Sequence, residues 1–267
     1  MIESVPDKRL VADSFSRAAS TYDQTTAFQR TVGTNLLARL PAGFAPSGIV
    51  DLGCGTGHFT RALSTLYRQP VLGLDLAEGM LRHARRHSPG QGGWVVADAE
   101  LLPLRSESRD LIFSSLALQW CPQLSLALNE AFRVLRPGGL LAFNTLLEGS
   151  LHELREAWRA VDDHVHVNRF TPAAELEAML AGTGFGHWRC ESETHVLHYP
   201  QLGELTRELR ALGATNRNPG RPAGLGSAAR LRRLTAGYEQ FRTAQGLPAT
   251  WQVAQVLMFK TAAGERP

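Results

Sequence analysis

The 267-residue sequence lacks any run of about 18 apolar residues, the length at which a membrane-spanning helix becomes a candidate, so neither such a helix nor membrane binding is expected. The charged N-terminal residues 1–9 lack the long apolar region of a signal peptide. Cysteine is scarce: Cys54, Cys121 and Cys190 are far apart, odd in number and without metal-ligand spacing. These absences predict a reduced, cytoplasmic protein without a metal site.

Apolar residues make up 43% of the chain, which is enough for a globular core. The net charge of +3 is unevenly distributed, because residues 201–242 hold eight arginines and three glutamates and the remainder carries −2. Such a basic segment can steer an acidic partner, or it can be the solvated surface of a helix. No nucleic-acid partner is expected, since aromatic residues are sparse there and no recognition motif accompanies the charge.

Short apolar segments alternate with helical patterns from about residue 48 to residue 147. The expected strands are 48–52, 71–75, 94–97, 111–115 and 140–146, and the expected helices between them are 57–66, 78–86 and 124–134. This alternation predicts a parallel sheet with helices on both faces. In such sheets the ligand lies beyond the carboxyl ends of the strands.

The segments on either side of this region are mainly helical. Residues 8–40 show helical spacing, and after residue 150 two helices are expected at 151–164 and 171–181, with Thr171 as N-cap and Pro172 as first helical residue. A strand at 188–197, the arginine-rich helical segment and a strand at 251–260 complete the chain. We therefore expect one continuous domain, with a helical lid over 1–46, an α/β core over 47–147, and a helical insertion with the final strands over 148–267.

Residues 50–57, Val-Asp-Leu-Gly-Cys-Gly-Thr-Gly, form the most informative motif. After a buried strand, glycine can take positive φ angles and bring the backbone close to a ligand, and the next helix presents free N–H groups. Dinucleotide sites normally read G-x-G-x-x-G, whereas Gly57 falls one residue earlier. This spacing, with an acid at Asp51 that can accept from a cationic methionine group, favours S-adenosylmethionine (SAM). The alternative is an ordinary glycine-rich turn.

Two further acids end the second and third expected strands. Asp75 lies 22 residues after Gly53, where a carboxylate can accept two hydrogen bonds from a ribose diol. Asp98 could accept a hydrogen bond from the adenine amino group. Either acid alone could be a helix N-cap, but acids at three successive strand ends favour the cofactor site.

Together, residues 51–57, Asp75, residues 98–99 and residues 135–139 resemble the ordered motifs of class I SAM-dependent methyltransferases over about residues 30–147. The resemblance implies a Rossmann-like, doubly wound, mostly parallel seven-stranded sheet, with SAM as methyl donor and S-adenosylhomocysteine as product. The cofactor contacts that it implies are Tyr22, Asp51, Gly53, Gly55, Gly57, Asp75, Leu76, Met80, Asp98, Ala99, Ser114 and Ser115.

Motifs over nearly the whole chain resemble the malonyl-[acyl-carrier protein] O-methyltransferases of biotin synthesis. They lie at residues 15–23, 114–121, 149–154, 168–170 and 212–215. The Leu-Gln-Trp element at 118–120 is also similar to trans-aconitate methyltransferases, which likewise esterify a carboxylate, and the motifs at 168–170 and 212–215 favour the first family. Two departures are Thr56, where relatives can have proline, and a long segment rich in proline and glycine after Asn216.

The implied reaction is attack of a malonyl carboxylate on the SAM methyl group, for which no general base is needed because the carboxylate is already ionised at neutral pH. The protein must align the reacting atoms and exclude water. Tyr22 would close over SAM at the reacting centre, Gln119 would orient the carboxylate, Trp120 would exclude water, and Arg169 would anchor the malonyl or thioester group. Tyr22 and Trp120 could instead be core aromatics, and Arg169 a surface ion pair.

The partner implied by this resemblance is an acidic acyl carrier protein, or coenzyme A, that carries the malonyl group on a phosphopantetheine arm. The arginines expected to receive the carrier are Arg207, Arg210, Arg230, Arg232 and Arg233. We expect a monomer. The alternatives are a small-molecule methyltransferase for trans-aconitate or a quinone precursor, and a SAM-binding protein that has lost catalysis.

Overall fold

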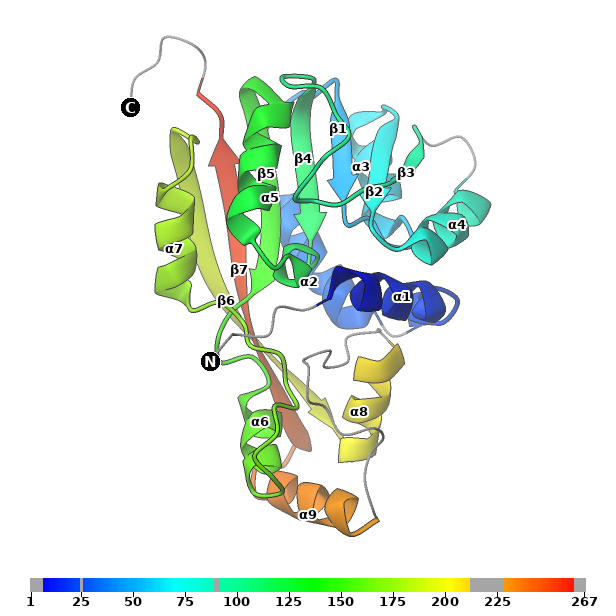
Figure 1. Cartoon of the computed structure of the whole chain (residues 1–267), viewed down its shortest axis with the longest axis vertical. Coiled ribbons are helices and arrows are strands. Elements are labelled where there is room, and N and C mark those ends of the chain that lie inside the picture. The colour runs from blue at the N-terminus through cyan, green and yellow to red at the C-terminus, as the bar shows by residue number, and fades with distance from the viewer. Residues whose placement is uncertain (1–6, 25, 89–91, 212–227, 262–267) are drawn as a thin grey trace.

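The computed structural model describes residues 7–24, 26–88, 92–211 and 228–261, which form a seven-stranded sheet between layers of helices (Figure 1). The strand order is β3-β2-β1-β4-β5-β7-β6, and β7 runs antiparallel to both of its neighbours while the other pairs are parallel. The strands are β1 Ile49–Leu52, β2 Val71–Asp75, β3 Trp94–Val96, β4 Arg109–Ser115, β5 Leu135–Leu146, β6 His187–Tyr199 and β7 Leu247–Phe259. The predicted fold class is confirmed.

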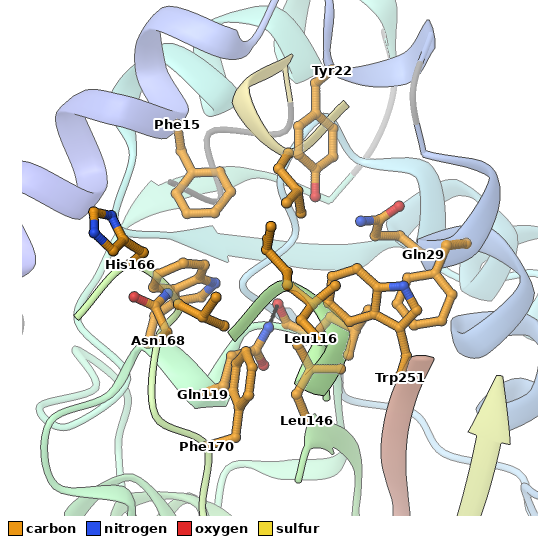
Figure 2. Close-up of a pocket in the computed structure, with 16 residues that line it drawn as sticks. Phe15, Tyr22, Gln29, Leu116, Gln119, Leu146, His166, Asn168, Phe170 and Trp251 are labelled. Atoms are coloured by element: carbon orange, nitrogen blue, oxygen red, sulfur yellow. Dashed lines mark hydrogen bonds between the residues drawn. The ribbon is translucent and has the colours of Figure 1, made fainter. Parts of the chain in front are cut away.

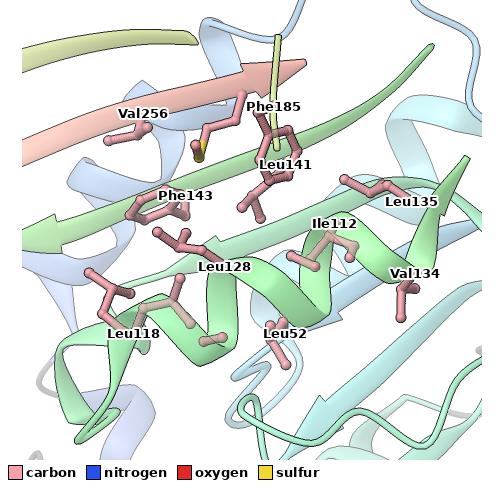
Figure 3. Close-up of a cluster of buried hydrophobic side chains, with 14 of the residues drawn as sticks. Leu52, Ile112, Leu118, Leu128, Val134, Leu135, Leu141, Phe143, Phe185 and Val256 are labelled. Carbon is pink, nitrogen blue, oxygen red and sulfur yellow. The ribbon is translucent and has the colours of Figure 1, made fainter. Parts of the chain in front are cut away.

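Helices cover both faces of the sheet because its central strands are apolar on both sides. The helices are α1 Lys8–Ala18, α2 Ala27–Ala38, α3 His58–Tyr67, α4 Glu78–His87, α5 Leu124–Val134, α6 His152–Arg159, α7 Ala173–Ala181, α8 Leu202–Ala211 and α9 Ala228–Glu239. Helices α5 and α7 pack on one face, in a cluster that includes Leu128 and Phe143 (Figure 3). Helices α2 and α3 pack on the other face, around Leu36, Leu63 and Phe113.

Strands β6 and β7 extend beyond the rest of the sheet and carry α6, α8 and α9 at their far end (Figure 1). A second apolar cluster fills this extension and includes Leu154, Leu205, Tyr238 and Trp251. The expected helical insertion is therefore divided: α6 and α7 precede β6, whereas α8 and α9 lie between β6 and β7.

The N-terminal segment lies across the carboxyl ends of the parallel strands (Figure 1). Helix α1 contacts α4 closely at Gly79, whose N–H donates to Ser16 Oγ at 3.1 Å. The prediction of one helical segment over 8–40 was wrong, because α1 ends at Ala18 and a short 3-10 turn, Tyr22–Gln24, separates it from α2. At this break the Thr21 hydroxyl donates to Ala18 O at 3.2 Å, a local bond that competes with a continuing helix.

Three other local predictions also differ from the structure. Thr171 does not cap α7, because its backbone pairs with residues 147–148, and Pro172 takes the N-cap position. Helix α6 ends at Arg159 rather than at residue 164. The strand expected at 140–146 begins earlier, at Leu135, and near this added part the pairing with β4 shifts register and Gly138 has φ +79°. Within the described residues, no helix is both long enough and apolar enough to span a membrane.

The contact between α1 and α4 predicts a stability effect. A Cβ at Gly79 would lie 2.7 Å from backbone and side-chain atoms of Ser16, so Gly79→Ala should lower the free energy of unfolding by about 1–3 kcal/mol through overpacking. Gly203→Ala on α8 is the matched control, since a Cβ added there would have no atom within 4 Å. Denaturant unfolding of both variants measures their free energies of unfolding. Equal values for the two variants would contradict a tight contact between α1 and α4 at Gly79.

Candidate active site

Two adjoining cavities lie where the N-terminal segment covers the sheet. The first lies at the carboxyl ends of β1, β2 and β4, and its wall is formed by Lys8, Val11, Ala12, Phe15, Tyr22, Leu52, Gly53, Asp75, Leu76, Ala77, Ala97, Asp98, Ala99, Ser115, Leu116, Ala117, Leu118, Trp120 and Cys121. Phe15, Tyr22, Leu116 and Trp120 line the second cavity too. These four side chains therefore mark the junction between the cavities.

The glycine loop shapes the floor of the first cavity. Gly53 has φ +71°, and a Cβ there would lie 2.2 Å from Ala117 Cβ, so only glycine fits between β1 and the segment after β4. The N–H groups of Gly53 and Cys54 donate to Leu74 O at 2.7 and 3.0 Å. The loop is thereby fixed to the end of β2.

Asp75 lies on the wall of the first cavity at the end of β2. Its two carboxylate oxygens accept hydrogen bonds from Gly55 N at 2.8 Å and Ala77 N at 2.7 Å. Burial raises the pKa of Asp75, and these two backbone bonds oppose that effect. Each oxygen retains a further lone pair for a ligand hydroxyl.

Asp51 lies beneath the glycine loop and is not part of the cavity wall. It accepts a 2.6 Å hydrogen bond from the Thr60 hydroxyl, and burial raises its pKa to about 7. Ser114 and Met80 are likewise buried and outside the wall, and Met80 supports Phe15 and Tyr22 from below. A direct contact between the cofactor and these three residues stays a prediction.

Lys8, at the start of α1, closes the opposite end of the first cavity. Its Nζ donates to both oxygens of Asp98, at 2.7 and 2.9 Å, and to Glu100 at 2.5 Å. Ala99 lies on the wall beside Asp98. The sequence patterns did not single out Lys8, because its partners are about 90 residues away in the chain.

The 3-10 turn places Tyr22 over the junction. Its ring packs edge-on against Phe15 with 6.3 Å between centroids, and Phe15 packs edge-on against Trp120 at 5.4 Å. Burial raises the pKa of the Tyr22 hydroxyl, with further contributions from Asp75 and Asp23, so it stays protonated. Thr56, one of the departures from relatives, donates to Asp23 Oδ1 at 2.7 Å and so connects the turn to the glycine loop.

The second cavity lies between the junction and the extension of β6 and β7. Its remaining wall is formed by Phe28, Gln29, Gln119, Leu146, Leu151, Leu154, His166, Val167, Asn168, Phe170, Leu209 and Trp251. In Figure 2, Tyr22 and Gln29 from the N-terminal segment face Leu116, Gln119 and Trp251 across this space. The wall is mainly apolar, with a few polar groups.

Leu116 follows β4 with φ +49°, a left-handed conformation that is uncommon for leucine. Its N–H donates to Asn144 Oδ1 at 2.8 Å, and its carbonyl accepts from Gln119 Nε2 at 2.7 Å. Asn144 is completely buried in β5. The strained residue is therefore held from both sides.

Arg169 is not part of either cavity wall. Its neighbours Asn168 and Phe170 line the second cavity, whereas Arg169 is exposed. The motif at 212–215 lies outside the described residues. Arg169 as an anchor of the acceptor stays a prediction.

The arginines expected to receive a carrier fall into two groups. Arg207 and Arg210 on α8, and Arg232 and Arg233 on α9, are exposed. Arg230 is instead half-buried: its Nε donates to Asp162 at 2.9 Å, and its guanidinium lies over Trp158 at 5.6 Å from the ring centroid. Arg230 thus stabilises the extension, because α6 and α9 pack through this contact.

Comparison with known proteins assigns the class. Residues 50–143 match the methyltransferase domain family. A putative methyltransferase from Bacillus halodurans has a TM-score of 0.59 at 18% identity, over 87% of this chain and 100% of that one. A putative methyltransferase from Haloferax volcanii, solved with the Trm112 activator, has a TM-score of 0.60 at 18% identity, over 96% and 100%. The fold and the glycine loop are those of a class I SAM-dependent methyltransferase.

Curated relatives narrow this class to a family. Malonyl-[acyl-carrier protein] O-methyltransferase of Methylococcus capsulatus is 46% identical, over 96% of this chain and 94% of that protein. The Hahella chejuensis protein of the same name is 40% identical, over 92% and 88%. The chain also matches 50% of the length of the biotin biosynthesis bifunctional protein BioHC of Cellvibrio japonicus, at 44% identity. The chain belongs to the malonyl-[acyl-carrier protein] O-methyltransferase family.

The residues of the first cavity fit SAM. Asp75 offers carboxylate oxygens suited to the ribose diol, and Asp98 with Ala99 offers an acceptor beside a small apolar wall suited to adenine. Gly53 lies on the cavity wall, where its backbone can contact the methionine portion. No group of three or more metal-ligating side chains occurs among the described residues.

Removal of the Asp75 carboxylate should weaken SAM binding. We expect Asp75→Ala to raise the Kd for SAM about 10- to 100-fold, since hydrogen bonds to a charged group typically contribute about 1.5–3 kcal/mol. Asp13→Asn, an exposed change on α1, is the control and should leave the Kd unchanged. Isothermal titration calorimetry measures both, and equal affinities for the two variants would exclude Asp75 as a cofactor contact.

Proposed function

We infer that the chain transfers the methyl group of SAM to the free carboxylate of malonyl-acyl carrier protein, which forms the methyl ester that enters pimeloyl synthesis for biotin. The match to malonyl-[acyl-carrier protein] O-methyltransferase of Methylococcus capsulatus, which covers 94% of that protein, supports this reaction. The structural observation that carries the mechanism is the junction, where Phe15, Tyr22, Leu116 and Trp120 belong to both cavities. A donor in one cavity and an acceptor in the other would meet there.

The first cavity would hold the methyl donor through Gly53, Asp75 and Asp98. SAM, when bound, supplies a methyl group activated by the positive charge on sulfur. The side chains at the junction have a positioning role, because the acceptor carboxylate needs no proton removed. Positioning of this kind can contribute roughly 7–11 kcal/mol to lowering a barrier.

Tyr22 would act at the junction as a hydrogen-bond donor and not as a base. Its raised pKa keeps the hydroxyl protonated at neutral pH, so it can orient a carboxylate oxygen. Phe15 and Trp120 surround this point with aromatic surface and exclude water from the nucleophile. Gln119, held by Leu116, stays a proposed orienting group because its amide also faces the second cavity.

The second cavity would hold the malonyl group and its carrier arm. No lysine or arginine belongs to its described wall, so the carboxylate would be desolvated without a strong ion pair that would reduce its nucleophilicity. Leu209 of α8 is part of this wall, and the exposed Arg207 and Arg210 lie on the same helix. Two exposed arginines therefore lie on a helix that lines the cavity, beside the half-buried Glu204 and Glu208, and they could attract an acidic carrier protein.

We also propose that one domain has three functional divisions. These are a lid over 1–46, a core over 47–147 and a cap with the final strands over 148–267. Carrier protein is proposed as the partner in preference to coenzyme A because relatives that are covered over most of their length carry its name. The cytoplasmic location and the monomeric state expected from the sequence stay predictions.

A direct assay separates this function from its alternatives. With methyl-labelled SAM, we expect label in an ester of malonyl-acyl carrier protein and none in trans-aconitate. Label in trans-aconitate alone would replace the proposed acceptor with a small tricarboxylate. SAM binding without transfer to either compound would favour a protein that has lost catalysis.

Charge reversal on α9 tests carrier docking. Arg232→Glu with Arg233→Glu should raise the KM for malonyl-acyl carrier protein about tenfold at low ionic strength, because exposed charges steer association and are screened by salt. The effect should shrink at high salt, and turnover of malonyl-pantetheine, which lacks the protein, should not change. An unchanged KM at low salt would remove α9 from the docking surface.

A further inference from the structure

The second cavity concentrates polar atoms that have no hydrogen-bond partner. Among the described residues, five buried side-chain nitrogen or oxygen atoms lack a partner, and three of them belong to this wall: Gln29 Oε1, Gln119 Oε1 and Trp251 Nε1. Folded proteins pair nearly all such atoms. Their concentration in one cavity points to a ligand that completes their hydrogen bonds.

The chemical character of Trp251 Nε1 and Gln119 Oε1 is fixed by their surroundings. Trp251 is 6% exposed, and its ring stacks on Phe28 with 4.9 Å between centroids, which sets the direction of its N–H donor. Gln119 Nε2 donates to Leu116 O, so the amide cannot be reversed without placing two carbonyl oxygens together. Its Oε1 is therefore an acceptor. The cavity thus offers one fixed donor and at least one fixed acceptor, with Gln29 Oε1 as a second acceptor.

This set of atoms discriminates between classes of acceptor substrate. Malonate and tricarboxylates such as trans-aconitate are fully ionised at neutral pH and offer only hydrogen-bond acceptors. They would leave both glutamine oxygens unpaired next to negative charge. A malonyl thioester on a pantetheine arm offers a carbonyl acceptor close to the carboxylate and amide N–H donors further along the arm.

We propose that Trp251 Nε1 donates to the thioester carbonyl of the acceptor, and that Gln29 Oε1 accepts from an amide N–H of the pantetheine arm. This assignment rests on the proposed function and names the groups that select a carrier-bound malonyl thioester over free acids. The carboxylate lies at the junction with Tyr22, and the arm continues towards Leu209 on α8. Gln119 Oε1 adds a second acceptor along this path.

The carbonyl contact is tested with Trp251→Phe, which keeps the stacked ring and removes the N–H. Two substrates are compared: malonyl-pantetheine, and S-(2-carboxyethyl)pantetheine, in which a methylene replaces the thioester carbonyl. The variant should lower kcat/KM for malonyl-pantetheine about five- to tenfold, the usual effect of one hydrogen bond, and should leave the value for the thioether unchanged within about twofold. A purely structural role would affect both substrates equally.

The amide contact is tested with Gln29→Leu, which has similar volume and no acceptor. The compared substrates are malonyl-pantetheine and the S-methyl thioester of malonate, which lacks amides. KM should rise about five- to tenfold for the first compound and stay within about twofold for the second. Phe170→Leu, which alters only the apolar wall, is the control and should change both substrates by similar factors.

These experiments test the two contacts separately from the methylation reaction. If either variant reduces activity by the same factor for both compounds of its pair, the assigned contact is refuted while the reaction stands. If the unmodified enzyme methylates trans-aconitate but none of the malonyl thioesters, the proposed function itself fails. Thermal unfolding of each variant verifies that the compared proteins are folded.

Discussion

The site depends on one strained residue, Leu116, held in a left-handed conformation at the end of β4. A non-glycine residue in this region costs roughly 1–3 kcal/mol, which the surrounding structure must offset. Asn144 Oδ1 and the Gln119 amide bind the two sides of the Leu116 backbone, and Asn144 in turn donates to Val32 O of α2 and to Gln255 of β7. The centre of the sheet thereby fixes the wall that both cavities share. The Leu116 carbonyl also holds the Gln119 amide, which lines the second cavity.

The N-terminal segment closes the site through contacts with parts of the chain that are far away in sequence. The Lys8 ammonium binds Asp98 at one end, the Ser16 hydroxyl binds α4 in the middle, and the carboxylate of Asp23 accepts from Thr56 beside the turn that carries Tyr22. Of these residues, Lys8 and Asp98 line the first cavity. The Asp98 carboxylate, which we propose as the adenine contact, is therefore also the partner of Lys8 at the start of this segment.

Much of the sheet was predictable because the central strands are short, apolar and separated by strong turn signals, and β2 matched its predicted bounds of 71–75. The glycine loop was also recognisable, because its positive φ angles and the 2.2 Å approach to Ala117 at Gly53 require glycine. Local patterns could not show that Thr171 pairs with Leu147 just beyond β5, or that Arg230 is held by Asp162, because both depend on tertiary contacts. For the same reason Trp251, on the last strand, gave no sequence signal as part of a cavity wall.

The central claim is that methyl transfer takes place at the junction formed by Phe15, Tyr22, Leu116 and Trp120. A crystal structure with S-adenosylhomocysteine and malonyl-pantetheine bound together tests it most directly. We predict the homocysteine sulfur in the first cavity and the malonyl carboxylate in the second, facing each other across Tyr22. A malonyl group bound elsewhere, for example on the exposed arginines of α9 with the second cavity still open, would contradict the account.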